Sequence, residues 1–454
     1  MASGVASQPD TGSPPELTAE QATATIASKG YIVLLALAAI VGVVVSLAAW
    51  CFLELVCQIQ QELFTHLPHA VGYPNGPPSW WSLPVLAVGG LIVALAISRL
   101  PGNGGHIPAE GLATGGFPAP IELPGVVLAG MATIGLGLVL GPEAPLIALG
   151  SGLGVLAIRA ARKNVPDQVV AVVAAAGSFA ALSFVFSSPL IAAVILIEAA
   201  GLGGPRLRII LLPGLLAAGI GSLVSLGIGS FTGLSTTAYA LDVLPLPAFN
   251  HLHVANFGWT IALAIAIAAV TRLIMAGGLM THRLAVRRLF MFLPAVGLII
   301  AGLAIAFSQA TSHSVNEILF SGQSQLPGLI SQAGAYSLGA LALLIVLKGI
   351  AYSLSLGSFR GGPTFPAIFL GAAAGIMASH LPGFPVTAAV AVGMSAAVAA
   401  VLRLPLTAVV VASVLTAKSG AAAEPLIIVA AVIAQVVTLV LSPRPSTSPQ
   451  VASR

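Results

Sequence analysis

Long apolar runs alternate with short polar or glycine- and proline-rich breaks along most of the chain. Several runs are shorter than the roughly 20 residues that a helix needs to cross a bilayer. Backbone groups freed at membrane depth must be satisfied by protein or line a cavity, and short, broken helices are typical of transporters. The apolar runs are residues 31–56, 83–99, 125–140, 144–160, 168–186, 189–200, 209–229, 258–276, 290–308, 337–356, 366–380, 386–402, 405–417 and 424–441. The pattern predicts an all-α polytopic membrane protein built from broken, tilted helices.

Composition supports this prediction. The chain has 454 residues, of which 57% are hydrophobic and only 7% are charged, whereas a soluble domain has about 25% charged residues. The net charge of +4 comes mainly from scarce acids and does not indicate a nucleic-acid partner. No metal motif or cofactor fingerprint is present, so we expect neither. The expected location is the cell membrane (plasma or inner), where the chain contacts the lipid bilayer as a multi-pass protein.

The two ends of the chain are polar. Residues 1–28 are rich in Ser, Thr, Ala and Pro and contain no Lys or Arg, a composition that predicts a disordered head. Residues 442–454 form a short polar tail. The membrane part between them is expected to run from 29 to 441.

An internal repeat divides this membrane part. The stretch "GPEAPLIALGSGLG" at Gly141–Gly154 matches "GPTFPAIFLGAAAG" at Gly362–Gly375 at seven of fourteen positions. The stretch Gly177–Val194 matches Gly393–Val410 at eight of eighteen positions. The two offsets nearly agree, which predicts two related halves, 29–250 and 251–441. With an odd number of crossings in each half, the halves would lie inverted in the bilayer.

Each half contains a "G-P-x-x-P" motif that opens a helix. Proline is suited to a first helical turn, and the free N–H groups that follow it carry the positive end of the helix dipole. Such a helix start is an anion site. Two of them brought together would face one anion from two sides without a full positive charge.

Glu143 stands at the first of these helix starts, and Thr364 is its repeat mate. An acid inside a membrane is costly and indicates a functional site by default. An ionised Glu143 would compete with an anion for the N–H groups and close the site, and a protonated or displaced one would open it. The alternative is that Glu143 only caps a helix in an interfacial loop.

These motifs resemble those of the CLC chloride channels and proton/chloride antiporters. "GGHIP" at Gly104–Pro108 looks like the family's first anion-site stretch, "GPEAP" at Gly141–Pro145 like the second, and "GGPTFP" at Gly361–Pro366 like the third. The resemblance covers about residues 31–440. It implies two inverted repeats, a homodimer with one pore in each subunit, transport of chloride or a similar small anion, and transport rather than enzymatic catalysis. It places the gating and proton-carrying glutamate on Glu143, and the anion site on Gly105, His106, Ile107, Pro142, Ala144, Thr364 and Phe365.

The chain departs from the family pattern in several places. The anion-coordinating Ser falls on Gly105, with His106 next, and Pro142 stands where a basic residue is usual. His106 is either a new anion donor or a solvated loop residue. No convincing match exists for the family's late Tyr. Loss of both side chains would leave a wider inner anion site.

Proton coupling depends on a second glutamate in the family. The stretch "PLIAAVILIEAA" at Pro189–Ala200 places the relay position on Ala199 and its neighbour on Glu198. Glu198 either takes over as the internal proton relay or closes the helix near the surface. Glu54 is a further acid in an apolar run, expected to pair within the helix bundle or lie at an interface. The sequence therefore leaves open a passive channel and a proton-coupled antiporter.

Two alternatives remain. Another anion of the same family, fluoride or nitrate, is one of them, because the selectivity-tuning Ser has changed and "GNG" at 102–104 resembles the Asn-containing version in fluoride-type members. An intramembrane hydrolase using Ser151 is the other. That chemistry needs a His base within hydrogen-bond reach, and the eight histidines lie in loops or at segment ends.

Overall fold

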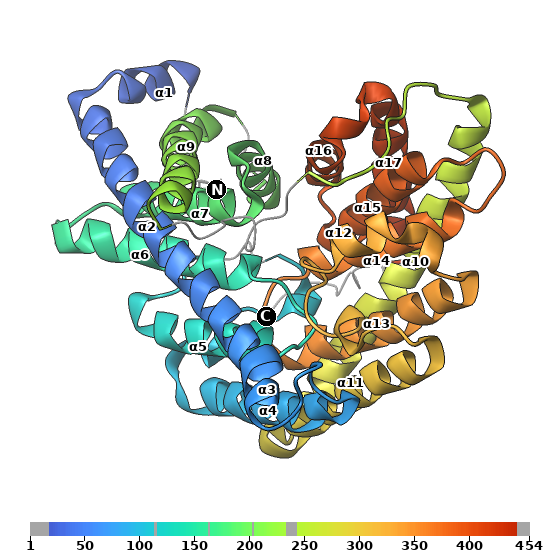
Figure 1. The fold of residues 1–454 in the computed structure, drawn as a ribbon. Helices are drawn as coiled ribbons and strands as arrows, with labels where there is room; N and C mark the ends of the chain where they lie inside the picture. The colour runs from blue at the N-terminus through green and yellow to red at the C-terminus, as the bar shows by residue number, and fades with distance from the viewer. Residues whose placement is uncertain (1–17, 113–115, 162–163, 202–203, 233–242, 443–454) are drawn as a thin grey trace, which may run out of the picture.

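The computed structural model describes residues 18–112, 116–161, 164–201, 204–232 and 243–442. Within those ranges every regular element is a helix, and the only β contact is an isolated bridge between Gly141 and Gly362. Figure 1 shows the helices of the N-terminal half, from blue to green, beside those of the C-terminal half, from yellow to red. The predicted all-α fold class is confirmed.

The N-terminal half contains two long helices, several spans of ordinary length and a series of short helical turns. Their bounds are α1 Ala19–Ile26, α2 Lys29–Gln61, the π-helical turn η1 Glu62–His66, α3 Leu67–Ala70, η2 Ser79–Trp81, α4 Ser82–Arg99, η3 Pro101–Gly104, η4 Pro108–Glu110, η5 Pro120–Glu122, α5 Leu123–Gly135, α6 Glu143–Ala161, α7 Asp167–Phe186, α8 Pro189–Ala199 and α9 Gly204–Thr232.

The C-terminal half shows a similar mixture of long and short helices. Their bounds are α10 Val254–Ala285, α11 Leu289–Thr311, η7 Val315–Glu317, α12 Leu326–Ser331, η8 Ala333–Ala335, α13 Leu338–Ser358, α14 Thr364–Ala378, α15 Val386–Leu402, α16 Pro405–Leu415, η9 Ala417–Ser419, η10 Ala421–Ala423 and α17 Glu424–Val440. Most runs predicted from the sequence correspond to one helix each, with ends displaced by a few residues.

Part of the predicted polar head is helical. Residues 19–26 form α1, which starts with a reciprocal capping box between Thr18 and Gln21. Such a box gives hydrogen-bond partners to two backbone N–H groups that a helix start otherwise leaves unpaired, and this stabilises the helix. Ser28 then caps α2 through the N–H of Tyr31. Residues 1–17 of the head and 443–454 of the tail lie outside the described residues.

Nine helices within the described residues are long and apolar enough to cross a membrane. Large hydrophobic side chains remain exposed along them, including Ile32, Leu226, Leu273, Met291 and Val440. In water such a surface would be strongly unfavourable, whereas a bilayer solvates it. The chain is therefore a multi-pass membrane protein.

The buried helices cross at glycines, and the crossings correspond between the halves. A Cβ added at Gly177 of α7 would lie 2.1 Å from the carbonyl oxygen of Gly150 in α6. A Cβ added at Gly393 of α15 would likewise lie 2.1 Å from the oxygen of Gly371 in α14. These four glycines are the ones that the sequence alignment of the repeat pairs. Both pairs let two backbones touch, which sets the positions of α6 and α14.

Candidate functional site

The two "G-P-x-x-P" motifs meet in space. Gly141 and Gly362 exchange two backbone hydrogen bonds, from N–H to carbonyl oxygen, with N···O distances of 2.7 and 2.6 Å. Helix α6 begins at Glu143 and helix α14 at Thr364, each two residues after its bridging glycine. The bridge therefore places the two helix starts next to each other, as the repeat predicted.

Glu143 is buried between these helix starts, with only 1% of the residue exposed. Its Oε1 accepts a hydrogen bond from the backbone N–H of Thr364. Its other carboxylate oxygen is buried and has no hydrogen-bond partner among the described residues. The Glu143 carboxylate from one half thus occupies the start of α14 in the other half. The sequence had predicted that it would compete for the N–H groups at the start of its own helix.

Glycine at position 362 makes room for this carboxylate. A Cβ built on Gly362 would lie 1.9 Å from Cδ of Glu143, and one built on Gly141 would lie 2.2 Å from Oε2. Atoms cannot approach so closely, so both motif glycines are needed for the observed position of the glutamate. The glycines shared by the two motifs are thus a packing requirement as well as a helix-start signal.

Aromatic side chains enclose the second helix start. The rings of Phe365 and Phe186 stack with centroids 5.2 Å apart and an interplanar angle of 12°. The hydroxyl of Tyr352 in α13 donates to the carbonyl oxygen of Pro363 at 2.6 Å. Tyr352 was not predicted as a site residue, because it lies inside an apolar run and outside every motif. Its hydroxyl hydrogen is committed to that carbonyl.

The first motif forms a glycine-rich turn. Gly104 and Gly105 have φ angles of +72° and +100°, values that only glycine adopts freely. The N–H of Gly105 donates to the Gly102 oxygen at 2.8 Å. The ring Nε2 of the half-buried His106 lies 2.9 Å from the oxygen of Gly111, so this nitrogen donates and the ring is tied to its own loop.

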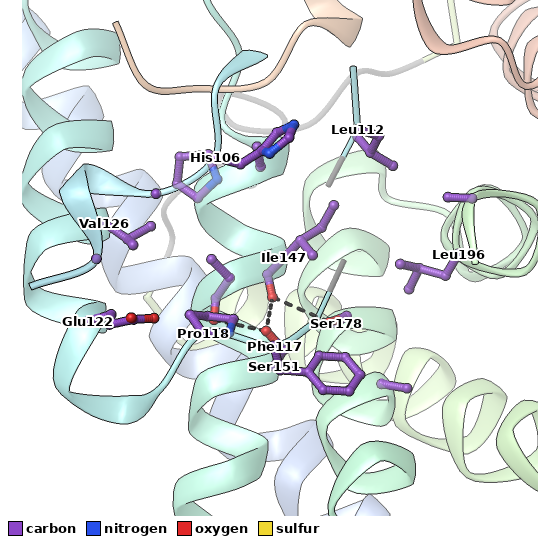
Figure 2. A pocket seen from close by; sticks show the side chains of 18 of the residues that line it. His106, Leu112, Phe117, Pro118, Glu122, Val126, Ile147, Ser151, Ser178 and Leu196 are labelled. Carbon is purple, nitrogen blue, oxygen red and sulfur yellow. Dashed lines mark hydrogen bonds between the residues drawn. The ribbon is translucent and has the colours of Figure 1, made fainter. Parts of the chain in front are cut away.

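A cavity of about 880 Å³ connects this turn to α6. Figure 2 shows His106, Ile147 and Leu196 around it, with the hydroxyls of Ser151 and Ser178 turned onto the carbonyl oxygen of Ile147. The cavity reaches Ala144 and Gly361, the neighbours of Glu143 and Gly362. Its charged and polar lining residues are Asn103, His106, Glu110, Glu122, Ser151, Ser178 and Arg360.

Glu198 and Ala199 face different surroundings. Ala199 lines the cavity. The two carboxylate oxygens of Glu198 instead accept the backbone N–H groups of Leu406 and Thr407, at 2.9 and 2.7 Å. These amides lie in the first turn of α16, so Glu198 caps a helix that belongs to the other half.

Glu54 and Ser151, which the sequence analysis also considered, form hydrogen bonds within their own helices. Oε1 of Glu54 accepts from the side-chain amide of Gln58 at 2.7 Å. The Ser151 hydroxyl donates to the carbonyl oxygens of Ile147 and Ala148, at 2.8 and 3.1 Å. Neither contact involves a histidine.

Arg360 is the cation of this region that the sequence motifs did not reveal. It is only 6% exposed and lines the cavity, although it lies two residues before the bridging glycine of the second half. No motif reserves a basic residue there. The only available signal was an arginine between two breaks in an otherwise uncharged stretch.

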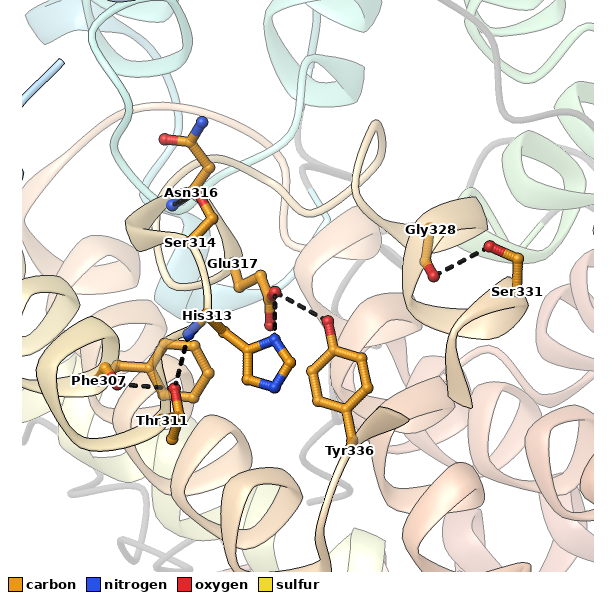
Figure 3. Close-up of polar contacts among 9 residues, drawn as sticks. All are labelled: Phe307, Thr311, His313, Ser314, Asn316, Glu317, Gly328, Ser331 and Tyr336. Carbon is orange, nitrogen blue, oxygen red and sulfur yellow. Dashed lines mark hydrogen bonds and ion pairs between the residues drawn. The ribbon is translucent and has the colours of Figure 1, made fainter. Parts of the chain in front are cut away.

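A separate polar cluster lies where α11 ends and α13 begins. Figure 3 shows the Tyr336 hydroxyl and the His313 ring converging on the Glu317 carboxylate. The Tyr336 oxygen is 2.8 Å from Oε1 of Glu317, and the Tyr336 and His313 rings stack at 4.2 Å. Burial raises the pKa of the Glu317 carboxyl, while the bond from Tyr336 and the charge of His313 act in the opposite direction.

Lys348 of α13 holds the same segment from inside. Its Nζ lies 2.7–3.3 Å from the carbonyl oxygens of Glu317, Ile318, Leu319 and Phe320, which share its three N–H groups. The N–H of Phe320 in turn donates to the oxygen of Gly137 at 2.9 Å. This cluster therefore supports the chain that leads to Glu143, and it is structural rather than part of the cavity.

Comparison with known proteins gives a consistent result. Residues 89–439 match the sequence model of the family described as "Voltage gated chloride channel". YfeO from Escherichia coli O1:K1 / APEC, named for a proposed role in ion transport, is 29% identical over 367 residues, which are 80% of this chain and 83% of YfeO. YfeO from Shigella boydii serotype 4 (strain Sb227) is 28% identical over the same length and shares.

Two solved structures share the fold. A slow cyanobacterial Cl⁻/H⁺ antiporter superposes with a TM-score of 0.70 at 20% identity, covering 91% of this chain and 95% of that protein. A CLC-type fluoride/proton antiporter superposes with a TM-score of 0.65 at 16% identity, covering 93% and 97%. At these identities the likeness shows the architecture of the helices and no more.

Proposed function

The chain belongs to the voltage-gated chloride channel family, whose members transport anions, and from this premise we propose that it carries chloride across the cell membrane with Glu143 as gate and proton carrier. The observation that carries the proposal is the position of the Glu143 carboxylate. A buried carboxyl oxygen accepts the first N–H of α14, where an anion would bind by the same interaction.

The proposed cycle follows from the chemistry of that contact. An ionised Glu143 fills the helix start and excludes a second anion. A proton on its carboxyl removes the charge that the Thr364 amide attracts, and the side chain can then leave the site to a chloride ion. The proposed anion site comprises Gly105, His106, Ile107, Pro142, Ala144, Thr364 and Phe365.

The organisation of the molecule is part of the proposal. We infer that residues 29–250 and 251–441 are inverted repeats, supported by the corresponding glycine crossings and by the bridge between the two motifs. We further propose a homodimer in the plasma or inner membrane. Glu198 is the candidate internal relay, and because each of its oxygens accepts one amide of α16, a proton on one oxygen would weaken the bond to one of the two amides.

The test uses purified full-length protein in liposomes loaded with chloride, with chloride efflux and external pH recorded together. Proton movement locked to chloride efflux, and lost in Glu143→Gln, is the expected result and establishes an antiporter. Chloride efflux without proton movement would establish a passive conductor, in agreement with Ala199 at the relay position. Absence of chloride flux would contradict chloride as the substrate, and absence of fluoride and nitrate flux as well would contradict anion transport.

A further inference from the structure

Arg360 is a buried cation in the wall of the cavity. It is 6% exposed, and the cavity wall also includes Gly361 next to it and the glycine turn of the first motif. Its stem packs on that turn, because a Cβ built on Gly104 would lie 3.3 Å from Cγ of Arg360. The absence of a side chain at Gly104 therefore leaves the space that the arginine occupies.

The guanidinium is only partly satisfied by the protein. Nε donates to the Asn103 oxygen at 3.3 Å, and Nη1 donates to the Phe359 oxygen at 3.1 Å. A guanidinium has five N–H groups, so three have no acceptor in the described part of the chain. Arg360 also forms no ion pair with a carboxylate there, although Glu110 of the same cavity wall interacts with it at longer range.

A cation in this position calls for an anion. Burial of a charge is strongly unfavourable unless a close partner neutralises it, and both carboxylates of the cavity wall, Glu110 and Glu122, lie beyond ion-pair distance of Arg360. The partner must be small enough for the cavity and must accept several N–H groups. Arginine differs from lysine in presenting two parallel N–H donors in a plane, which match two oxygens of a planar anion.

We propose that Arg360 forms an anion site in the cavity, before the Glu143 gate, and that this site prefers a small planar oxyanion such as nitrate, bicarbonate or formate over a spherical halide. The proposal rests on the proposed anion transport and names the substrate class of that pathway. Two N–H groups of the guanidinium hold two oxygens of the anion, and the stem of Arg360 stays on the glycine turn.

Binding and transport are measured separately to test this site. Sodium nitrate and sodium chloride are each titrated calorimetrically into the purified full-length protein in detergent. Wild type is expected to bind nitrate more tightly than chloride. Arg360→Lys keeps the positive charge but loses the two parallel N–H donors of the guanidinium. The nitrate-to-chloride affinity ratio should therefore fall roughly tenfold, while chloride binding persists. Arg159→Lys, an exposed arginine outside the cavity, is the matched control and should change neither affinity.

The outcomes separate this inference from the proposed function. An unchanged affinity ratio in Arg360→Lys, or no nitrate preference in wild type, would overturn the site. If the lysine variant does not give a monodisperse peak on gel filtration, Arg360→Gln replaces it, and retention of nitrate preference there would also overturn the site. Anion binding that follows this pattern without flux in liposomes would support the site and refute transport.

Discussion

The starts of helices α6 and α14 have the same backbone arrangement but different first residues, Glu143 in α6 and Thr364 in α14. Both follow a glycine that joins the Gly141–Gly362 bridge, and both helices cross their neighbours at equivalent glycines. Only α6 contributes a carboxylate, and only α14 donates the amide that this carboxylate binds. Under the proposed function, this difference turns a repeat into a gate: one copy keeps the amides that would bind an anion, and the other supplies a carboxylate that competes for them.

The largest effect is expected from removing this difference. Glu143→Thr gives the first motif the residue found in the second, so no carboxylate remains to compete for the Thr364 amide. Proton movement in the liposome assay should fall to the level of protein-free liposomes, and anion flux should no longer depend on pH. Glu54→Gln, which removes another acid from an apolar helix, is the control. Persistent proton coupling in Glu143→Thr would show that the gate lies elsewhere.

The aromatic pair tests the contact between the halves. Phe365→Ala removes a buried ring that stacks on Phe186, and a truncation of this kind typically costs about 3–5 kcal/mol. Phe186→Ala makes the equivalent change from the other half. Denaturation in detergent should show that the double variant loses less free energy of unfolding than the sum of the losses in the two single variants, by about 0.5–1.5 kcal/mol. Simple additivity would mean that the rings do not stabilise each other.

The bridging glycines sharpen the comparison further. Gly362→Ala places a methyl group 1.9 Å from Cδ of Glu143, and overpacking of this kind costs about 1–3 kcal/mol. We expect a lower melting temperature in detergent and increased anion leak at neutral pH. Combining it with Glu143→Thr should recover part of the lost stability, because the colliding carboxylate is gone. No recovery would indicate that the alanine disturbs only the backbone.

The short helices α8 and α16 give a second contrast. The Ile191 N–H in α8 is capped by the chain's own Ser188, whereas α16 has no local side-chain cap and uses Glu198 from the other half. Glu198→Ala should cost about 0.5–2 kcal/mol, and Glu198→Gln less, because the amide oxygen still accepts. Flux assays on the glutamine variant decide the second role: loss of proton coupling with normal stability would identify a relay.

The smallest expected effect is the pH dependence of stability caused by Glu317, which lies outside the helix starts compared above. Because burial raises the pKa of its carboxyl in the folded protein, folding favours the protonated form. Stability should therefore be highest below the pKa of an ordinary carboxyl and decline as the pH rises through the raised value. Thermal unfolding from pH 4 to 8 should show this slope flattened in Glu317→Gln and unchanged in Glu62→Gln, which alters an exposed acid. An identical slope in all three proteins would contradict it.

Much of this architecture was accessible from the sequence, because periodic apolar runs and repeated Gly-Pro motifs are local signals. They predicted the helices, the repeat and the meeting of two helix starts. What the sequence could not supply was the direction of side chains between segments far apart in the chain. Glu143 reaches a helix 221 positions away, Glu198 caps one 208 positions away, and Arg360 fills space beside Gly104. Such contacts depend on the packing of the helices and leave no spacing rule along the chain.

The Gly141–Gly362 bridge also restricts how the molecule can move. Two backbone hydrogen bonds join the halves at the centre of the site, so rocking one half against the other would have to break them together with the packing around them. Many carriers alternate by such rocking. Under the proposed function, the moving part is the Glu143 side chain within a fixed backbone, and turnover would then be limited by the arrival of a proton rather than by the rotation of a domain.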